Sequence, residues 1–215
     1  LKKTGLKNFD RMDNWWPIPS ARGCSFNCAF CASGRFWKHR YRKKSMPCLI
    51  DDIQRCQRDY HVKRFFFDEL AFTSDKKRIR MFCEELKRHR MDIEWCCDTR
   101  IDCVDEKLLD MVYRAGCRRI HFGVESFSNR ILGLMNKKYD SDRALELLNY
   151  SHRIGIRTIC NIILGYPGEN DATLRETLAH INRLEKGIYC NAIIFHMYTG
   201  TDIYDLAKKR NLVND

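Results

Sequence analysis

Short apolar runs alternate along the chain with longer segments whose apolar residues recur at helical spacing. Arg64–Phe67 has the length of a strand, and Thr158–Leu164 is an apolar run with one polar residue, which is typical of a strand buried on both faces. Residues 75–88 instead place their apolar side chains on one face of a helix. This alternation predicts a parallel sheet whose strands are connected by helices packed outside it.

The pattern predicts six strand–helix units. The predicted strands are Ile18–Ser20, Arg64–Phe67, Ile93–Cys97, Arg119–Val124, Thr158–Leu164 and Tyr189–His196. The predicted helices are Met46–Tyr60, Asp75–Arg88, Asp105–Gly116, Asn129–Met135, Ser141–Ile154, Asp171–Glu185 and Asp202–Lys209. Ser45, Ser74 and Asp105 are expected to cap the first three helices. Eight such units would close a TIM barrel, so six predict an α/β fold with an open, partial (β/α)6 TIM-like barrel.

Polar residues follow every predicted strand, at the edge where the active sites of such barrels form. They are Cys24, Cys28 and Cys31 after the first strand, Asp68 and Glu69 after the second, Asp98, Thr99 and Arg100 after the third, Glu125 and Ser126 after the fourth, Gly165 after the fifth and His196 at the end of the sixth. Such a ring without gaps favours a functional site at this edge.

The most informative residues are Cys24, Cys28 and Cys31, whose spacing is CxxxCxxC. An iron–sulfur cube takes four thiolates when it is closed, so three thiolates on one loop leave the fourth iron open to a non-protein ligand. Tetrahedral zinc is the alternative, but zinc usually takes paired CxxC knuckles, and the sequence has no second CxxC pair and no HxxxH. Gly23 allows a tight turn, and Phe30 offers a flat apolar face beside the cluster.

Composition limits the partners and the compartment. The other nine of the 12 cysteines are spread through predicted strands and helices, which favours free thiols in a reducing cytoplasm. The net charge is +11, and its densest run, residues 38–44, follows the cysteines directly. Such a surface suits nucleic acid, an acidic electron-transfer protein or a phosphorylated substrate, but a solvated basic loop looks the same. No apolar run approaches the ~20 residues of a membrane span, and no secretory signal opens the chain.

At 215 residues the chain has the length of one domain. We expect an N-terminal lead-in, residues 1–20, followed by a core domain, residues 21–215. Because the chain starts at Leu1 and stops without a tail, we expect it to be a piece of a longer polypeptide.

The cysteine motif resembles the signature of radical S-adenosylmethionine (SAM) enzymes. The resemblance continues through Phe67–Glu69, Phe122–Ser126 and Ile163–Glu169, in the order expected of that family's core, and covers nearly the whole chain. It is greatest to the branch whose members often carry an upstream cobalamin-binding domain, with tRNA methylthiotransferases next. The resemblance implies that Cys24, Cys28 and Cys31 hold a [4Fe–4S] cluster whose fourth iron is chelated by SAM.

The resemblance also implies which residues bind SAM. Asp68 and Glu69 stand where the family binds the SAM ammonium, and we favour Asp68 because the usual Gly-Gly before Glu is absent. Arg100 is the candidate for the SAM carboxylate, with Arg130 and Arg143 as rivals. Glu125 and Ser126 are implied for the ribose hydroxyls.

Adenine is expected to lie against Ile163 and Gly165, with Phe30 completing the wall, although Asn161 replaces the first glycine of the family pattern. His196 is expected to face the substrate or the adenine.

The implied activity is reductive cleavage of SAM to a 5′-deoxyadenosyl radical, which abstracts a hydrogen atom from an unidentified substrate. A flavodoxin- or ferredoxin-like reductant would supply the electron, and we expect Phe65, Phe67, Phe122 and Ile162 to fill the barrel and exclude water. A cobalamin domain outside these residues would imply methyl transfer or rearrangement. The alternatives are methylthiotransferase-like modification of tRNA, a non-catalytic nucleic-acid-binding module stabilised by a cluster or zinc, and a degenerate barrel that holds a cluster for structure or redox sensing.

Overall fold

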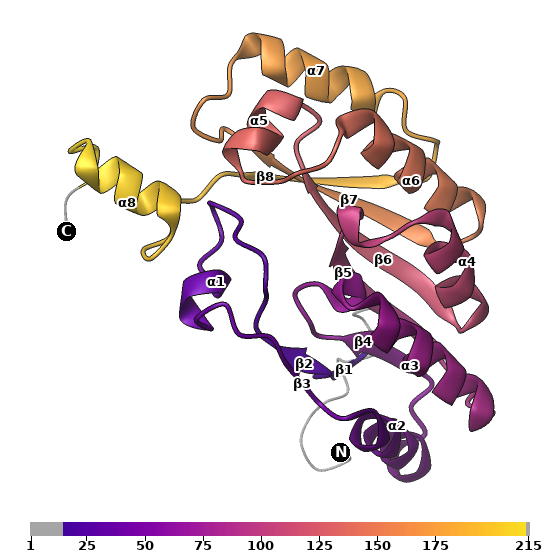
Figure 1. The fold of residues 1–215 in the computed structure, drawn as a ribbon. Helices are drawn as coiled ribbons and strands as arrows, with labels where there is room; N and C mark the ends of the chain where they lie inside the picture. Colours follow the sequence, from indigo (N-terminus) through magenta and orange to yellow (C-terminus); the bar gives the residue numbers. More distant parts are fainter. Residues whose placement is uncertain (1–14, 214–215) are drawn as a thin grey trace, which may run out of the picture.

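The computed structural model describes residues 15–213, in which six parallel strands form one open sheet (Figure 1). The strands lie side by side in the order β1-β4-β5-β6-β7-β8, and every neighbouring pair is parallel. In chain order they are β1 (Trp16–Ile18), β4 (Arg64–Phe67), β5 (Glu94–Arg100), β6 (Cys117–Glu125), β7 (Arg157–Leu164) and β8 (Tyr189–Ile194). The predicted partial barrel of parallel strands is confirmed.

Helices connect the strands and cover one side of the sheet (Figure 1). They are α2 (Met46–Tyr60), α3 (Lys76–Arg88), α4 (Glu106–Arg114), α5 (Asn129–Leu134), α6 (Ser141–Arg153) and α7 (Asp171–Ile181). The last helix, α8 (Asp202–Lys209), lies away from α3 and α4, near the short helix α1 (Ser33–Phe36). Ion pairs from Arg35 to Asp202 and Asp205 join α1 to α8. Within residues 15–213, every helix is too short or too polar to cross a membrane.

Two of the three predicted helix caps are confirmed. The side chains of Ser45 and Asp105 accept hydrogen bonds from backbone N–H groups in the first turns of α2 and α4. The predicted Ser74 cap is wrong, because Ser74 ends a short 3-10 helix, η2 (Phe72–Ser74). Asp75 caps α3 instead by accepting the N–H of Arg78 at 3.0 Å.

Several element ends differ from the prediction, most by one or two residues, as in β1, β6 and α4. Strand β5 continues to Arg100 because Asp98, Thr99 and Arg100 stay in parallel register with β6, so these residues belong to the strand and not to the loop after it. Helix α7 ends at Ile181, before the predicted Glu185. Strand β8 ends at Ile194, so His196 lies in the loop that follows.

The main apolar core lies between the sheet and its covering helices. Phe65, Phe67, Phe122 and Ile162 are fully buried in it. Phe67, for example, stacks on Phe72 of η2 with ring centroids 4.6 Å apart. The expectation that these four side chains fill the barrel is therefore wrong: successive strand residues point to opposite faces, and these four belong to the helix-covered face.

A small antiparallel ribbon of β2 (Ala21–Arg22) and β3 (Arg42–Lys43) precedes α2. Between its strands run α1 and residues 23–31, which we call the cysteine loop. Two-residue strands have no periodicity to detect, so the sequence did not predict the ribbon. Of the expected lead-in, residues 16–18 form β1 and pair with β4, whereas residues 1–14 lie outside the described residues.

Candidate functional site

The cysteine loop is held from two distant parts of the chain. The backbone N–H of Ala29 donates to the carbonyl of Met135 at 3.1 Å, directly after α5, and the N–H of Ile203 in α8 donates to the carbonyl of Ala29 at 3.2 Å. The side-chain amide of Asn136 also donates to the carbonyl of Asn27 at 2.6 Å. These bonds fix the loop between α5 and α8.

Gly23 opens the cysteine loop in a conformation that requires glycine. Its φ is +88°, and a Cβ added there would lie 2.0 Å from the carbonyl oxygen of Arg40. The expected tight turn at Gly23 is therefore confirmed. It lets the two ends of the segment that carries Cys24, Cys28 and Cys31 pass close to each other.

Arg100 reaches the cysteine loop from the end of β5. Its Nη1 lies 2.9 Å from the Sγ of Cys28, and its guanidinium carbon is 4.1 Å from the ring centroid of Phe26. The carboxylate of Asp102 holds the guanidinium group of Arg100 in place, accepting hydrogen bonds from its Nε at 2.9 Å and from its Nη2 at 2.7 Å. A positive charge is thus held rigidly against one thiol of the motif.

Lys137 is a second cation at the site, and the sequence did not predict it. It is 4% exposed, and its Nζ donates to the carbonyl of Gly123 at 2.7 Å and to Oε1 of Glu125 at 2.9 Å. The same Nζ is 5.9 Å from the ring centroid of Phe30 in the cysteine loop. From sequence, a lysine that follows a short helix is expected to be exposed to solvent, whereas the tertiary fold buries Lys137.

Glu125 meets Lys137 through an unusual backbone conformation. Its φ is +70°, and the register between β6 and β7 shifts between Gly123 and Glu125. A non-glycine residue in the left-handed region carries strain that the surrounding structure must hold, and such residues cluster at functional sites. The bulge directs the Glu125 side chain to Lys137 at the site edge.

Charge and burial act in opposite directions on the thiols. Burial raises the pKa of Cys24 and of Cys28, and neighbouring cysteines of the motif raise both further. The positive charges of Lys137 and Arg100 lower the pKa of the same two thiols. The cations therefore favour the thiolate form, which is the form that binds metal.

The donor set fits an iron–sulfur cluster. Cys24, Cys28 and Cys31 are free, half-buried and close enough to influence one another's ionisation. Soft thiolates without hard oxygen ligands are the donors that such clusters take. Among residues 15–213, no three His, Cys, Asp or Glu side chains converge on the position of a single metal ion.

The two acidic residues after β4 have different environments. Glu69 is buried, and its carboxylate oxygens accept hydrogen bonds from the hydroxyls of Ser20 and Tyr41. Burial raises the pKa of Glu69, although these two hydrogen bonds lower it in part. Asp68 is exposed. Glu69 is thus committed to the packing of the β2–β3 ribbon, which leaves Asp68 available to a ligand.

The structure brings two of the expected adenine residues together. Ile163 lies in a small apolar cluster with Tyr166 of the following loop, and Phe30 packs against this cluster. Gly165 has a φ of +78°, and nothing lies within 4 Å of a Cβ added there. Free space at Gly165 therefore adjoins this apolar cluster where the adenine was expected.

Two of the candidate SAM contacts, Ser126 and the rival cation Arg143, do not reach this edge, whereas His196 follows the end of β8 at this edge. Ser126 is buried and its hydroxyl lies 3.3 Å from that of Thr177 in α7, because the residue after the inward Glu125 points to the helix side. Arg143 lies on α6 and forms a bidentate ion pair with Glu106. His196 is exposed on the loop after β8.

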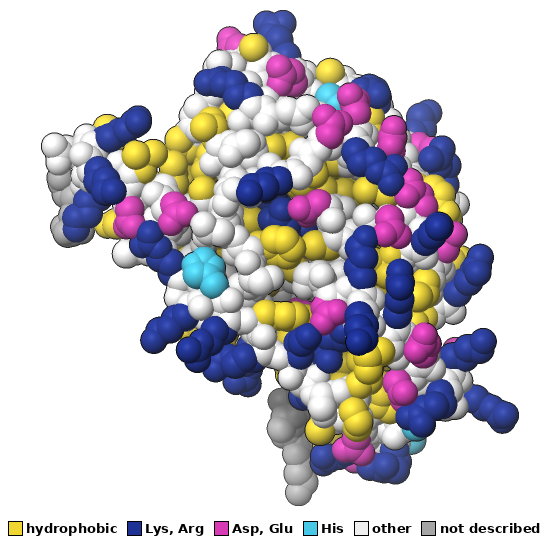
Figure 2. Space-filling view, viewed as in Figure 1, with side chains coloured by type: hydrophobic (Ala, Val, Ile, Leu, Met, Phe, Trp, Pro, Cys, Tyr) yellow, Lys and Arg dark blue, Asp and Glu magenta, His cyan; other side chains and the backbone are white. Residues whose placement is uncertain are grey.

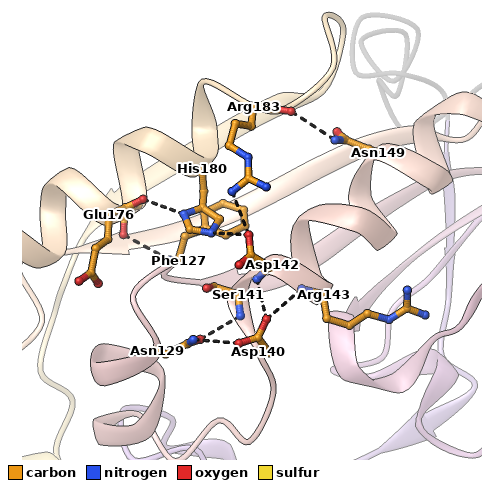
Figure 3. A network of polar contacts seen from close by, with 11 residues as sticks. Phe127, Asn129, Asp140, Ser141, Asp142, Arg143, Asn149, Glu176, His180 and Arg183 are labelled. Carbon is orange, nitrogen blue, oxygen red and sulfur yellow. Dashed lines mark hydrogen bonds and ion pairs between the residues drawn. The ribbon is translucent and has the colours of Figure 1, made fainter.

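A polar network joins the starts of α5 and α6 to α7 (Figure 3). Asn129 donates to Asp140 at 2.9 Å and accepts the N–H of Ser141 at 2.9 Å, which joins the start of α5 to that of α6. Asp142 in turn lies 3.3 Å from Nε2 of His180 on α7 (Figure 3). These contacts join α5, α6 and α7 to one another on the helix-covered side of the sheet.

The fold and site define a class of protein, and comparison with known proteins gives the family. The family model described as the radical SAM superfamily matches residues 18–181, so the chain belongs to this superfamily, whose members bind a [4Fe–4S] cluster and SAM. The resemblance drawn from the cysteine motif is confirmed.

Its relatives are longer proteins. An uncharacterized methyltransferase of Pyrococcus horikoshii is 28% identical over 196 residues, which make up 91% of this chain and 42% of that protein. An anaerobic magnesium-protoporphyrin IX monomethyl ester cyclase of Rubrivivax gelatinosus is 32% identical over 166 residues, 74% of this chain and 29% of that protein. The chain thus spans less than half the length of these relatives.

Among solved structures, the radical SAM methyltransferase TsrM of Kitasatospora setae, with cobalamin and a [4Fe–4S] cluster bound, has a TM-score of 0.80 at 16% identity. The match covers 91% of this chain and 37% of that one. At this identity the likeness shows the fold.

Proposed function

We propose that this chain is the catalytic core of a radical SAM enzyme that carries out cobalamin-assisted methyl transfer or rearrangement on a substrate still to be identified. Bound cluster and SAM would supply the chemistry, namely reductive cleavage of SAM to a 5′-deoxyadenosyl radical. The observation that carries the proposal is the placement of two fixed cations, Arg100 and Lys137, against a loop of three free thiols. The methyltransferases among its relatives support methyl transfer.

The residues of the chain have separate roles in this proposal. Cys24, Cys28 and Cys31 hold the cluster. Arg100 stabilises the Cys28 thiolate by a charge-assisted hydrogen bond from Nη1. Asp102 accepts hydrogen bonds from Nε of the same guanidinium group and so holds it in this orientation.

SAM itself is held by other side chains. Lys137 joins Arg100 as a candidate for the SAM carboxylate, and Asp68 takes the ammonium. Glu125 takes the ribose hydroxyls without Ser126, whose hydroxyl is engaged with α7. The apolar surface of Phe30, Ile163 and Gly165 receives the adenine. His196 remains a candidate for substrate contact.

Anaerobic reconstitution with iron and sulfide, reduction by dithionite and chromatographic detection of 5′-deoxyadenosine test the proposal. The wild-type chain should bind about four irons per chain and form 5′-deoxyadenosine from SAM. A colourless product that holds zinc and leaves SAM intact would overturn the proposal and favour the non-catalytic alternatives.

The reductant has a candidate docking surface beside the cysteine loop. Lys38 and Arg40 are exposed, and the Arg42 guanidinium lies 5.4 Å from the ring centroid of the adjacent Trp37. By contrast, Lys43 and Lys44 are paired with Asp75 and Asp52. Figure 2 shows basic side chains gathered on this part of the molecule. We propose that an acidic flavodoxin- or ferredoxin-like protein binds here, in the reducing environment of the cytoplasm.

Charge reversal tests this surface. The double variant Lys38→Glu/Arg40→Glu should slow cluster reduction by flavodoxin about tenfold at low salt, with less effect at high salt, and leave reduction by dithionite unchanged. Lys107→Glu on the distant helix α4 is the matched control. Equal rates in both variants would exclude this docking site, and salt-sensitive binding of tRNA lost in the double variant would favour the methylthiotransferase-like alternative.

A further inference from the structure

The inner face of the sheet carries polar side chains, whereas the helix-covered face is apolar. Parallel sheets usually have helices on both faces and apolar side chains on both. Here the residues that alternate with the buried core of β5, β6, β7 and β8 face the barrel interior. They include the polar or small residues Cys96, Asp98, Arg100, Arg119, His121, Gly123, Arg157, Asn161 and Asn191, together with the apolar or aromatic residues Ile159, Ile163, Tyr189 and Ile193. Polar side chains on this face can bind a polar ligand, and the ring of Trp15 already covers part of the face, 5.0 Å from the guanidinium carbon of Arg119.

The register of the strands arranges this interior in layers below the cysteine loop. Arg100, which contacts Cys28, is in register with Gly123 and lies in the upper layer. Asp98 is in register with His121 one layer deeper. Two residues along a strand rise about 6–7 Å, so the Asp98–His121 pair lies roughly that far below Arg100. The Asp98–His121 pair therefore lies on the inner face of the sheet, two residues along the strand from the layer of Arg100.

Asp98 has an oxygen without a hydrogen-bond donor. Its Oδ1 is shielded from solvent and accepts no hydrogen bond from any described residue, although the side chain as a whole is 45% exposed and Nδ1 of His121 lies 3.3 Å from this oxygen, a contact that becomes an ion pair only when His121 is protonated. Shielded carboxylate oxygens are normally paired, since leaving one unmatched is costly. A ligand that donates a hydrogen bond would satisfy this oxygen.

The surrounding charges favour a positively charged donor. Burial and the neighbouring carboxylate of Asp68 raise the pKa of Asp98 to about 6, and Arg119 lowers it in part. On the other side, burial together with Arg119 and Arg157 lowers the pKa of His121, so its imidazole is neutral at pH 7. A neutral imidazole and a carboxylate both accept hydrogen bonds, and a cation between Asp98 and Asp68 would relieve their mutual repulsion.

We propose that Asp98 and His121 form a binding site for an amine-bearing substrate, whose ammonium group donates hydrogen bonds to both side chains. The inference rests on the proposed function for its position relative to SAM, but the binding itself requires neither cluster nor SAM. A substrate anchored here by its ammonium would present the adjoining carbon atoms to the layer of Arg100, where the chemistry would take place.

The test uses the cluster-free chain of 215 residues with isotope-labelled histidine, followed by NMR. His121 is assigned by the signal that disappears in His121→Gln. The probes are n-butylammonium, n-butanol and n-butyrate, which share a chain and differ in the head group. We expect n-butylammonium to shift the His121 ring signals saturably, n-butanol to bind more weakly and n-butyrate not to bind.

Asp98→Asn keeps the shape and removes the charge, and it should weaken n-butylammonium binding about tenfold or more, as expected for a hydrogen bond to a charged group. Asp92→Asn, at an exposed acid before β5, is the control and should leave the affinity unchanged. Circular dichroism verifies that each variant is folded. Absence of a saturable shift, equal binding of n-butyrate, or undiminished affinity in Asp98→Asn would overturn the proposal. Because SAM is absent, this outcome is independent of whether 5′-deoxyadenosine is formed.

Discussion

The ion pair between Lys137 and Glu125 should be a main source of stability at the site edge. Their side chains are only 2% and 13% exposed, and Lys137 also donates to the carbonyl of Gly123. Lys137→Met would leave a carboxylate buried without its partner, which costs about 3–5 kcal/mol. For a domain of this size, such a loss lowers Tm by roughly 6–20 °C. The exposed neighbour provides a control, since Lys138→Met should change stability by less than about 0.5 kcal/mol.

A double-mutant cycle separates the pair from its surroundings. Lys137→Met/Glu125→Gln removes both charges, so only the carbonyl of Gly123 remains unmatched, at about 1–3 kcal/mol. We therefore expect the double variant to be more stable than Lys137→Met alone, in urea unfolding followed by circular dichroism of the cluster-free chain. If the two single costs add within about 0.5 kcal/mol, the two side chains do not interact as described.

Three further predictions concern other parts of the site. Cys28→Ala should abolish iron and sulfide incorporation and 5′-deoxyadenosine formation, whereas Cys48→Ala, exposed on α2, should leave both unchanged. Tyr41→Phe removes a hydrogen bond to buried Glu69 and should lower the free energy of unfolding by about 1–3 kcal/mol in urea titrations. The pKa of Asp98 is raised to about 6, so the folded chain releases this proton later than the unfolded chain, and stability falls as the pH rises from about 4 to 6. Asp98→Asn should therefore stabilise the chain above pH 6 relative to pH 4, by on the order of 1 kcal/mol after solvent screening, and a pH-independent difference would contradict this.

The fold was predictable because its signals are local. The apolar runs of β4 and β7 and the caps of α2 and α4 depend on residues close in sequence, and their alternation predicted a parallel sheet with helical connections. Element ends were less predictable. The residues near Asp98 in sequence do not predict that β5 continues to Arg100, because the hydrogen bonds that extend this strand come from its pairing with β6.

The site was predictable where a motif encodes it and unpredictable where tertiary contacts do. The spacing of the cysteines and the residues around them identified the motif, but the sequence could not show that Glu69 accepts hydrogen bonds from Ser20 and Tyr41. Lys137 was missed for the same reason, since a left-handed Glu125 and the end of α5 together bury it.

The alternation of residues along each strand predicts which side chains face the barrel interior. Phe65 and Phe67 were expected to line the barrel because they are apolar, yet the period of two assigns them to the face that carries Trp95 and Cys97. The same period sends Asp98 inward. The helix-covered face of this barrel is therefore apolar, whereas polar residues such as Asp98 interrupt the apolar pattern of its strands and point to the inner face.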